Sequence, residues 1–441
     1  MPVTQRRIVI TGMGLVCPLG STKDALWEGL SSGRSAVGPL SAVLLGALPV
    51  PFGAEARGFQ TDDIDGFGPL DKERKKAIRK GLKMMCRECQ MGVAAAQLAL
   101  ADARLAPGQI DPDRAGISFG AEYVPSIPEE FIEPIRQCLD EQGHFRFSRW
   151  GNEGMPKMTP LWLLKYLPNM PASHLAIYND LRGPNNSLTQ REAAADLAVG
   201  EAHEIILRSS ADVMVVGANG SRLHPMKLIQ SLQHNELADG RVEPARASRP
   251  FDLHRTGMVL GEGAGAIVLE ELGRAQARGA TIYGEILGGS SSCAAGRNLA
   301  ARREQAMANA LRAVLKKAGA RNDEIGHLHG HGLSTRRGDA EEARAIHQVF
   351  GTRAHPLPVV AAKSYFGNLG AGSGLVELIA SVLALRHDRL FPILNYETPD
   401  PACPVAAVAD GQTPSGGSFI HLSVTPQGQA GAVLVRRFAE G

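Results

Sequence analysis

The stretch RPFDLHRTGMVLGEGAGAIVLE, from Arg249 to Glu270, ends in AGAIVLE, an apolar and β-branched run that is typical of a buried strand. Runs of the same kind occur on both sides of it and alternate with longer segments that favour helices. The strand-type runs are RIVITGM, AGISFGA, ADVMVVGA, LPVVAAK and AGAVLVRRF, and the helix-type segments are CQMGVAAAQLALADA, QREAAADLAVGEAHEIILR and REQAMANALRAVLKKAG. This alternation predicts an α/β protein whose sheets are covered by helices.

The composition is that of an ordinary globular protein, with 441 residues, 44% hydrophobic and 21% charged. A net charge of +2 predicts no nucleic-acid partner. The longest apolar runs, such as VMVVGA at Val213 to Ala218, are too short to cross a bilayer, so we expect no membrane span and a cytoplasmic protein. The cysteines lack the spacing of a disulfide framework, which favours reduced thiols; they are Cys17, Cys86, Cys89, Cys138, Cys293 and Cys403.

The stretch from Arg249 is one of five blocks that lie in order along nearly the whole chain. The others are RRIVITGMGLVCPLG from Arg6, HGHGLSTRRGD from His329, AAKSYFGNLGAGSG from Ala361 and LNYETPDPACP from Leu394. Together they resemble the β-ketoacyl-acyl-carrier-protein synthases, or ketosynthases. The resemblance implies a thiolase-like fold, in which two pseudo-repeated α-β-α halves form a five-layered core.

The same resemblance implies a division of the chain into an N-terminal half at 1–272 and a C-terminal half at 273–441. Between about 123 and 182 lies a polar segment rich in proline and aromatic residues. In relatives, such loops cover the pocket and help to build a dimer. A homodimer or a heterodimer with a ketosynthase is therefore expected, and ADVMVVGAN, from Ala211 to Asn219, would be the strand that pairs across the two-fold axis.

No cysteine lies between Cys138 and Cys293, the region where the family has its nucleophile. In relatives that cysteine follows a Gly-Pro pair, at the start of a buried helix whose N-terminus lowers the thiol pKa. Counting from Gly183 in GPNNSLTQREAAADLAVGEA places Glu192 at the cysteine position. An alternative explanation of Glu192 is a capping box, in which Thr189 caps the helix and the glutamate returns to its N–H.

The other catalytic elements of the family are partly retained. His331 matches the first catalytic histidine, and Asn368 stands where the second histidine belongs. An asparagine amide can donate a hydrogen bond, but it carries no charge and cannot shuttle a proton at neutral pH. Lys363 matches the family's buried lysine, and Glu377 matches a structural glutamate whose alternative is an acid on a helix surface.

Residues for substrate binding follow from the same comparison. Thr335 matches a threonine that contacts the pantetheine arm, whereas Leu333 replaces another. In the run SVTPQGQAG, aligned at Ser423, Pro426 occupies the position of the oxyanion donor and Gln427 follows it. Proline has no N–H to donate. We therefore assign Thr335, Pro426 and Gln427 to the binding of substrate and its 4'-phosphopantetheine arm.

We predict no metal and no cofactor. His327, His329 and His331 alternate and could form a metal site on one strand face, but no acidic or cysteine ligand lies beside them. An acyl carrier protein is the expected macromolecular partner, and the acidic carrier could dock on a basic helix. The cations of that helix are Lys72, Arg74, Lys75, Lys76, Arg79, Lys80, Lys83 and Arg87.

These replacements predict a degenerate ketosynthase that does not condense acyl chains. It resembles the chain-length-factor subunits of aromatic polyketide systems, which lack the cysteine and pair with an active ketosynthase to shape an acyl pocket. The alternative is an enzyme of another kind. It would be a malonyl-carrier-protein decarboxylase, or an acyl-thioester enzyme in which Glu192, its pKa raised by burial, is a general base tuned by His331.

Overall fold

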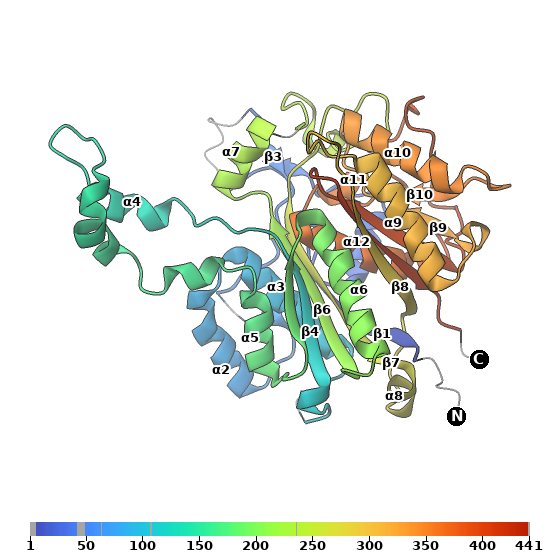
Figure 1. Cartoon of the computed structure of the whole chain (residues 1–441), viewed down its shortest axis with the longest axis horizontal. Helices are drawn as coiled ribbons and strands as arrows, with labels where there is room; N and C mark the ends of the chain where they lie inside the picture. Colours follow the sequence, from blue (N-terminus) through green and yellow to red (C-terminus); the bar gives the residue numbers. More distant parts are fainter. Residues whose placement is uncertain (1–5, 42–48, 63, 106–107, 235, 440–441) are drawn as a thin grey trace.

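The computed structural model describes residues 6–41, 49–62, 64–105, 108–234 and 236–439. Its strands form an 11-stranded mixed sheet in the order β11-β10-β9-β12-β13-β8-β1-β7-β6-β4-β5, and a separate two-stranded ribbon joins β2 to β3. The large sheet consists of two parts that meet where β1 pairs with β8 over only three residue pairs, from Ile8 to Ile10. Figure 1 shows these two parts side by side, each covered by helices.

The N-terminal part of the sheet has mixed strand directions. Strand β7 pairs antiparallel with both β1 and β6, and β6, β4 and β5 run parallel to one another. Helices α3 and α5 cover its outer face. The bounds are β1 Ile8–Val16, α3 Arg87–Asp102, β4 Ala115–Ala121, α5 Met170–Asn179, β5 Asn185–Thr189, β6 Val213–Ser221 and β7 Glu262–Glu271.

The C-terminal part repeats the plan. Strands β8, β13 and β12 are antiparallel neighbours, and β9, β10 and β11 continue the sheet in parallel. Helices α9 and α10 lie outside it. The bounds are β8 Gly284–Cys293, α9 Arg303–Ala318, β9 His327–His329, α10 Arg336–Phe350, β10 Pro358–Val360, β11 Ala406–Ala407, β12 Ser418–Val424 and β13 Gln429–Arg436.

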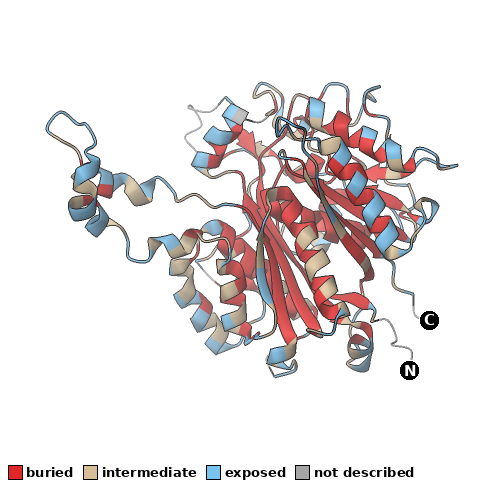
Figure 2. Ribbon diagram, in the orientation of Figure 1, coloured by how far each residue is buried: buried red, intermediate tan, exposed pale blue. Residues whose placement is uncertain are grey.

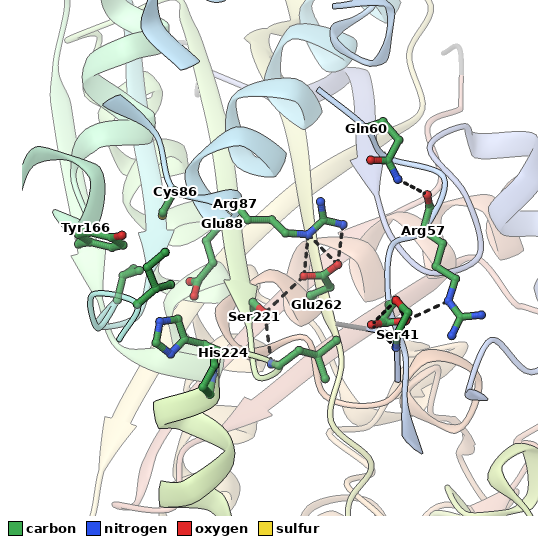
Figure 3. Close-up of a pocket in the computed structure, with 15 residues that line it drawn as sticks. Ser41, Arg57, Gln60, Cys86, Arg87, Glu88, Tyr166, Ser221, His224 and Glu262 are labelled. Atoms are coloured by element: carbon green, nitrogen blue, oxygen red, sulfur yellow. Dashed lines mark hydrogen bonds and ion pairs between the residues drawn. The ribbon is translucent and has the colours of Figure 1, made fainter. Parts of the chain in front are cut away.

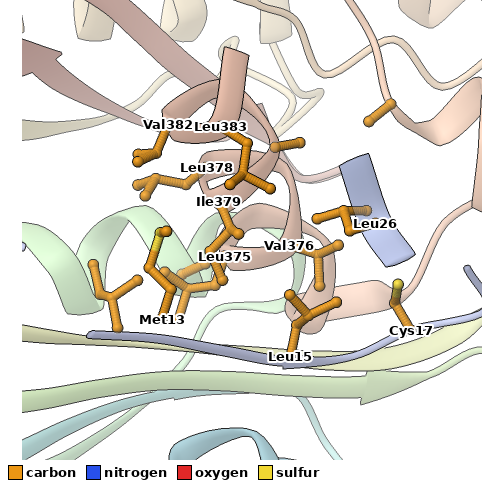
Figure 4. Close-up of a cluster of buried hydrophobic side chains, with 14 of the residues drawn as sticks. Met13, Leu15, Cys17, Leu26, Leu375, Val376, Leu378, Ile379, Val382 and Leu383 are labelled. Carbon is orange, nitrogen blue, oxygen red and sulfur yellow. The ribbon is translucent and has the colours of Figure 1, made fainter. Parts of the chain in front are cut away.

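Helices α6, Ala194–Leu207, and α12, Ser373–His387, form the middle layer, because each contacts strands of both parts of the sheet. Helix α12 reads SGLVELIASVLALRH and is buried along almost its whole length, as expected of a helix that is apolar on every side. Figure 4 shows its Leu375 and Ile379 packed against Met13 and Leu15 of β1. The order helix, sheet, helix, sheet, helix confirms the predicted five-layered thiolase-like core.

Residues 123 to 168 leave the body as a projecting arm, which Figure 1 shows in green-blue to the left. It contains α4 and several short turns of 3-10 or π-helix, and Figure 2 shows that most of it is exposed or half-buried. The arm lies within the loops predicted at 123–182. The remaining elements are α1 Lys23–Ser31, β2 Gly38–Pro39, β3 Phe52–Gly53, α2 Lys72–Gly81, α4 Glu129–Gln137, α7 Pro225–His234, α8 Leu272–Ala277 and α11 Lys363–Phe366.

The prediction that ADVMVVGAN pairs across a two-fold axis is wrong. ADVMVVGAN contains β6, which already has β7 on one side and β4 on the other, so its backbone hydrogen-bonding groups are taken. The open edge of this part of the sheet is β5. The division of the chain at residues 272 and 273 falls at the start of α8 and remains a prediction. Within the described residues, no helix combines the length and apolar character needed to span a membrane.

Candidate functional site

Glu192 lies in a single 3-10 turn, Arg191–Ala193, between the end of β5 and the start of α6. The turn begins with Arg191 at φ 51°, a left-handed conformation that an arginine rarely adopts. The side chain of Glu192 is buried, and its Oε1 accepts hydrogen bonds from Arg222 Nη2 at 2.5 Å and from Asn368 Nδ2 at 3.1 Å. The two residues predicted to stand at the cysteine and second-histidine positions, Glu192 and Asn368, are therefore bonded to each other.

Two interpretations of Glu192 are wrong. The capping box does not form, because Thr189 ends β5, the 3-10 turn has no side-chain cap, and the carboxylate is bonded to Arg222 and Asn368. The prediction of a raised pKa is also wrong. Burial alone would raise the pKa of Glu192, but the charges of Arg222 and Arg191 bring it well below its ordinary value. The carboxylate is ionised at neutral pH and is a poor general base there.

Glu192 is one end of a buried chain of ion pairs. Arg222 Nη2 also lies 3.1 Å from Glu122 Oε2, and Lys227 Nζ bridges Glu122 Oε1 at 2.5 Å and Glu88 Oε1 at 2.8 Å. All of these side chains are buried. Buried charges are tolerated only when they are paired, so the chain Glu192, Arg222, Glu122, Lys227, Glu88 must be counted as one electrostatic unit.

The side chain of Asn368 is fully engaged. Its Oδ1 accepts from the Gly370 N–H at 3.0 Å and from Ser373 Oγ at 3.4 Å, while Nδ2 points to Glu192 and to Met258 Sδ. The two amide hydrogens thus already have acceptors inside the protein. In this arrangement, Asn368 holds the Glu192 carboxylate.

His331 is buried and its ring is neutral. Burial, and then the charge of Lys363, lower its pKa to about 3, and Nδ1 has no hydrogen-bond partner among the described residues. The backbone at His331 is held in place, because the N–H groups of His331 and Gly332 donate to the two oxygens of Glu342 at 2.6 and 2.9 Å. His331 is therefore a positioned neutral imidazole whose Nδ1 is buried without a partner among the described residues.

A second buried chain begins at Lys363. Its Nζ donates to Glu377 Oε1 at 2.6 Å, Glu377 Oε2 lies 3.2 Å from His421 Nε2, and His421 Nδ1 lies 2.6 Å from Asp196 Oδ1. Burial would lower the pKa of His421, but the flanking carboxylates of Asp196 and Glu377 raise it to about 9. Glu377 is completely buried, so its interpretation as a helix-surface acid is wrong.

The structure brings five of the predicted site residues together. Glu192 and Asn368 are in direct contact, Lys363 and Glu377 are ion-paired, and the pKa of His331 responds to the charges of Lys363, Glu192 and Glu377. Thr335 lies at the start of α10, where its N–H donates to Asp339 Oδ1. Pro426 and Gln427 form the turn between β12 and β13.

The histidines beside His331 have structural partners. His327 contacts Ser381 Oγ and the Ser415 carbonyl, and His329 contacts Ser381 Oγ and accepts from the Ala362 N–H. Both rings are buried, and burial lowers the pKa of each. In the part of the chain that the structure describes, no three His, Cys, Asp or Glu side chains are grouped so as to hold a metal ion.

Sequence reasoning missed the residues that complete both chains. A weak signal was present for Asp196 in AAADLAVG and His421 in SFIHLSV, since each is a charged or polar residue inside an otherwise apolar segment. Such a residue must find a partner when it is buried, but the sequence does not say which one. The missed residues are Glu88, Glu122, Asp196, Arg222, Lys227 and His421.

Comparisons with known proteins match most of the chain to one family. Residues 5–275 match the family model of the β-ketoacyl synthase N-terminal domain, and residues 283–397 match that of the C-terminal domain. Two relatives named 3-oxoacyl-[acyl-carrier-protein] synthase 2, from Synechocystis sp. and from Coxiella burnetii, are each 32% identical over 400 residues, or 90% of either chain.

Solved structures show the same architecture. A β-ketoacyl synthase from Burkholderia phymatum STM815 is 28% identical, with a TM-score of 0.83 over 98% of this chain and 100% of that one. The ishigamide ketosynthase/chain length factor also has a TM-score of 0.83, over 99% of this chain and 100% of that one, and its 24% identity supports the shared fold. From the two domain matches and the 32% identity over 90% of its length, this chain belongs to the β-ketoacyl synthase family.

Proposed function

We propose that this chain is a non-condensing member of the family, which pairs with an active ketosynthase in fatty acid or polyketide biosynthesis. The observation that carries the proposal is the bonding at residue 192. A carboxylate stands at the position matched to the nucleophilic cysteine, and its Oε1 is held by Arg222 and Asn368. The polar groups of the site are bonded to one another, and hydrogen bonds to a charged group are stronger than neutral ones.

The chemistry of condensation does not fit these groups. A carboxylate that attacks a thioester gives a reactive anhydride, so the stable acyl-enzyme of covalent catalysis is lost. Asn368 cannot carry a proton in place of a histidine. If Pro426 occupies the oxyanion position, the missing N–H costs roughly 3 kcal/mol of transition-state stabilisation. Each loss weakens the same reaction.

A partner role fits the surface better. The arm carries exposed apolar side chains, among them Phe147 and Leu161, and β5 presents an open sheet edge. Exposed apolar patches and unpaired edges are features that a second chain covers. In this role the chain, like a chain-length factor, would contribute one wall of an acyl pocket in a dimer with a ketosynthase or with a second copy.

An acyl carrier protein remains the expected macromolecular partner. The relatives at 32% identity are named for carrier-protein substrates. Helix α2 and the turn after it expose a cluster of cations that outnumber the acids of the same helix, which suits an acidic partner. They are Lys72, Lys76, Arg79, Lys80 and Lys83. Arg87 begins α3 instead and pairs with Glu262 at 2.7 Å.

One observation favours a second candidate, a malonyl-carrier-protein decarboxylase. His331 has a neutral ring whose buried Nδ1 lacks a hydrogen-bond partner among the described residues, and a movement of the ring would let it donate to a thioester or to the enolate that decarboxylation leaves. Two others oppose it: the ionised Glu192 repels a malonyl carboxylate, and the amide of Asn368 is already bonded. We rank it second.

The test exposes the protein to malonyl-loaded and acyl-loaded carrier protein and follows both thioesters by intact mass. We expect neither thioester to change and no acyl group to appear on the protein, while the Synechocystis relative serves as a positive control. An acyl adduct or a condensed product would refute the proposal. Loss of CO2 that disappears in His331→Ala would establish the decarboxylase instead. A cysteine-bearing ketosynthase that co-purifies with the chain would support the partner role.

A further inference from the structure

A cavity of about 470 Å³ lies between the root of the arm and the body. Figure 3 shows its lining: Tyr166 and Cys86 at one end, Arg87, Glu262 and Ser221 in the middle, and Ser41, Arg57 and Gln60 at the other. Its wall is mostly apolar and includes Val124, Ile127, Leu223 and Pro225. None of the residues considered for condensation lines it.

Three carboxylates line this cavity, and their pairing differs. Glu55 is bound by Arg57 at 3.0 Å, and Glu262 is bound by Arg87 at 2.7 Å. Glu88 is bound, among the residues that the structure describes, by Lys227 alone, which reaches its Oε1 and is shared with Glu122. The second oxygen of Glu88, Oε2, has no hydrogen-bond partner among the described residues, although the side chain is buried.

The order of charges along the buried chain of ion pairs explains why Glu88, at its end, has an oxygen without a partner among the described residues. The buried chain from Glu192 to Glu88 contains three carboxylates and two cations, Arg222 and Lys227. At the Glu192 end, Arg191 lies 3.6 Å from Oε2, and Asn368 bonds to Oε1. At the Glu88 end, no described residue donates to Oε2 of the last carboxylate, and burial raises the pKa of Glu88 to about 7.

We infer that this cavity binds a small organic ammonium ion with an apolar body. The ammonium donates to Glu88 Oε2 and completes the alternation of charges, while the apolar body packs against Val124, Ile127 and Leu223. A neutral molecule of the same shape fills the cavity but leaves the carboxylate unbalanced. This inference is independent of the proposed function.

The test titrates the full-length protein with n-hexylammonium and with 1-hexanol, using isothermal calorimetry. We expect the ammonium to bind at least about tenfold more tightly than the alcohol, since a hydrogen bond to a buried charge is worth more than a neutral one. Glu88→Gln should remove that preference, whereas Glu133→Gln, on the exposed face of α4, should leave it intact. Thermal melts of each variant establish that it is folded.

A second variant tests the cavity without touching the charge chain. Ile127→Trp should fill the space at the root of the arm and weaken both ligands alike. Ammonium affinity of the native chain should also rise with pH across about pH 7, as Glu88 ionises. The groups that face Glu88 keep their charge in that range: Lys227 and Arg222 stay cationic because their pKa values are raised, and the Cys86 thiol stays neutral with a pKa of about 12.

Three results would overturn the inference. They are equal binding of the alcohol and the ammonium, a preference that survives Glu88→Gln, and no ammonium binding at millimolar concentration. Equal binding would leave an apolar cavity without charge recognition. None of these results bears on condensation, so the failure of this inference is separable from the failure of the proposed function.

Discussion

At the scale of single residues, Glu192 and Asn368, which the resemblance matches to the nucleophile and the second histidine, depend on each other. Glu192 needs a hydrogen-bond donor because its carboxylate is buried and ionised. The side-chain amide of Asn368 supplies that donor, whereas a charged histidine would supply its N–H with a different geometry. Arg222 supplies the opposite charge. Reverting one of these residues alone leaves a buried charge or amide without its partner.

Arg222→Met tests this account of stability. The substitution leaves the carboxylates of Glu122 and Glu192 buried without their shared cation, so we expect a loss of about 3 to 5 kcal/mol in the free energy of unfolding. Urea denaturation of both proteins gives the difference. Arg344→Met, which removes the half-exposed pair of α10 with Glu304, should cost under about 1 kcal/mol. A similar small loss for Arg222→Met would contradict the account.

At the scale of secondary-structure elements, the sequence predicts the layers but not the contacts between them. The apolar run at Val213 to Ala218 and the helix beginning near Ala194 are recognisable from local pattern, since burial sets the period of apolar residues. Strand neighbours depend on topology, which local pattern does not reveal. The sequence therefore predicts that β6 pairs across a two-fold axis, although the strand lies in the interior of the sheet. The ion pairs were missed because each partner comes from a different element, as with Glu88 of α3 and Lys227 of α7.

The packing of β12 against α6 and α12 predicts a pH dependence of stability. The pKa of His421 is about 9 in the folded protein and about 6.5 when unfolded. A raised folded pKa gives stability that is full below the unfolded value and is lost as the pH rises through about 9, with an upper bound of roughly 3 kcal/mol. We expect His421→Gln to be destabilising at about pH 6, with a difference from the native chain that shrinks towards pH 10.

Urea unfolding at several pH values measures that difference. Glu342, whose pKa burial raises to about 8, weakens the fold in the same direction as pH rises, so only the comparison of the two proteins isolates His421. His355→Gln, at an exposed histidine of the C-terminal half, serves as the control and should show no such trend. A native-to-variant difference that stays constant with pH would mean that His421 is not charged in the folded protein.

At the scale of the whole molecule, the two buried chains of charged side chains come near each other at His331. One buried chain comes from the N-terminal half and ends at Glu192, and the other begins at Lys363 of the C-terminal half. The pKa of His331 is sensitive to the charges at both ends. Because the ends of both chains beside His331 are buried and ion-paired, this centre is preorganised.

In the proposed partner role, the arm is the surface that a second chain would cover. Phe147 is 77% exposed and Leu161 is 67% exposed, and both lie on a segment that projects away from the core. Replacing both by aspartate should separate dimers into monomers at micromolar concentration, because a charge in an apolar interface must be desolvated. Light scattering coupled to gel filtration measures the mass, and the melting temperature of the monomer should be unchanged, since neither side chain packs in the core.

Leu299→Asp provides the matched control. This leucine is 87% exposed but lies on the C-terminal half, away from the arm and from the open edge at β5, so its substitution should leave the dimer intact. A double variant of Phe147 and Leu161 that remains dimeric would move the interface to β5 alone, where backbone hydrogen bonds rather than side chains join the chains. A native chain that is monomeric by itself, yet dimeric with a ketosynthase, would mean that the apolar arm selects a different chain as its partner.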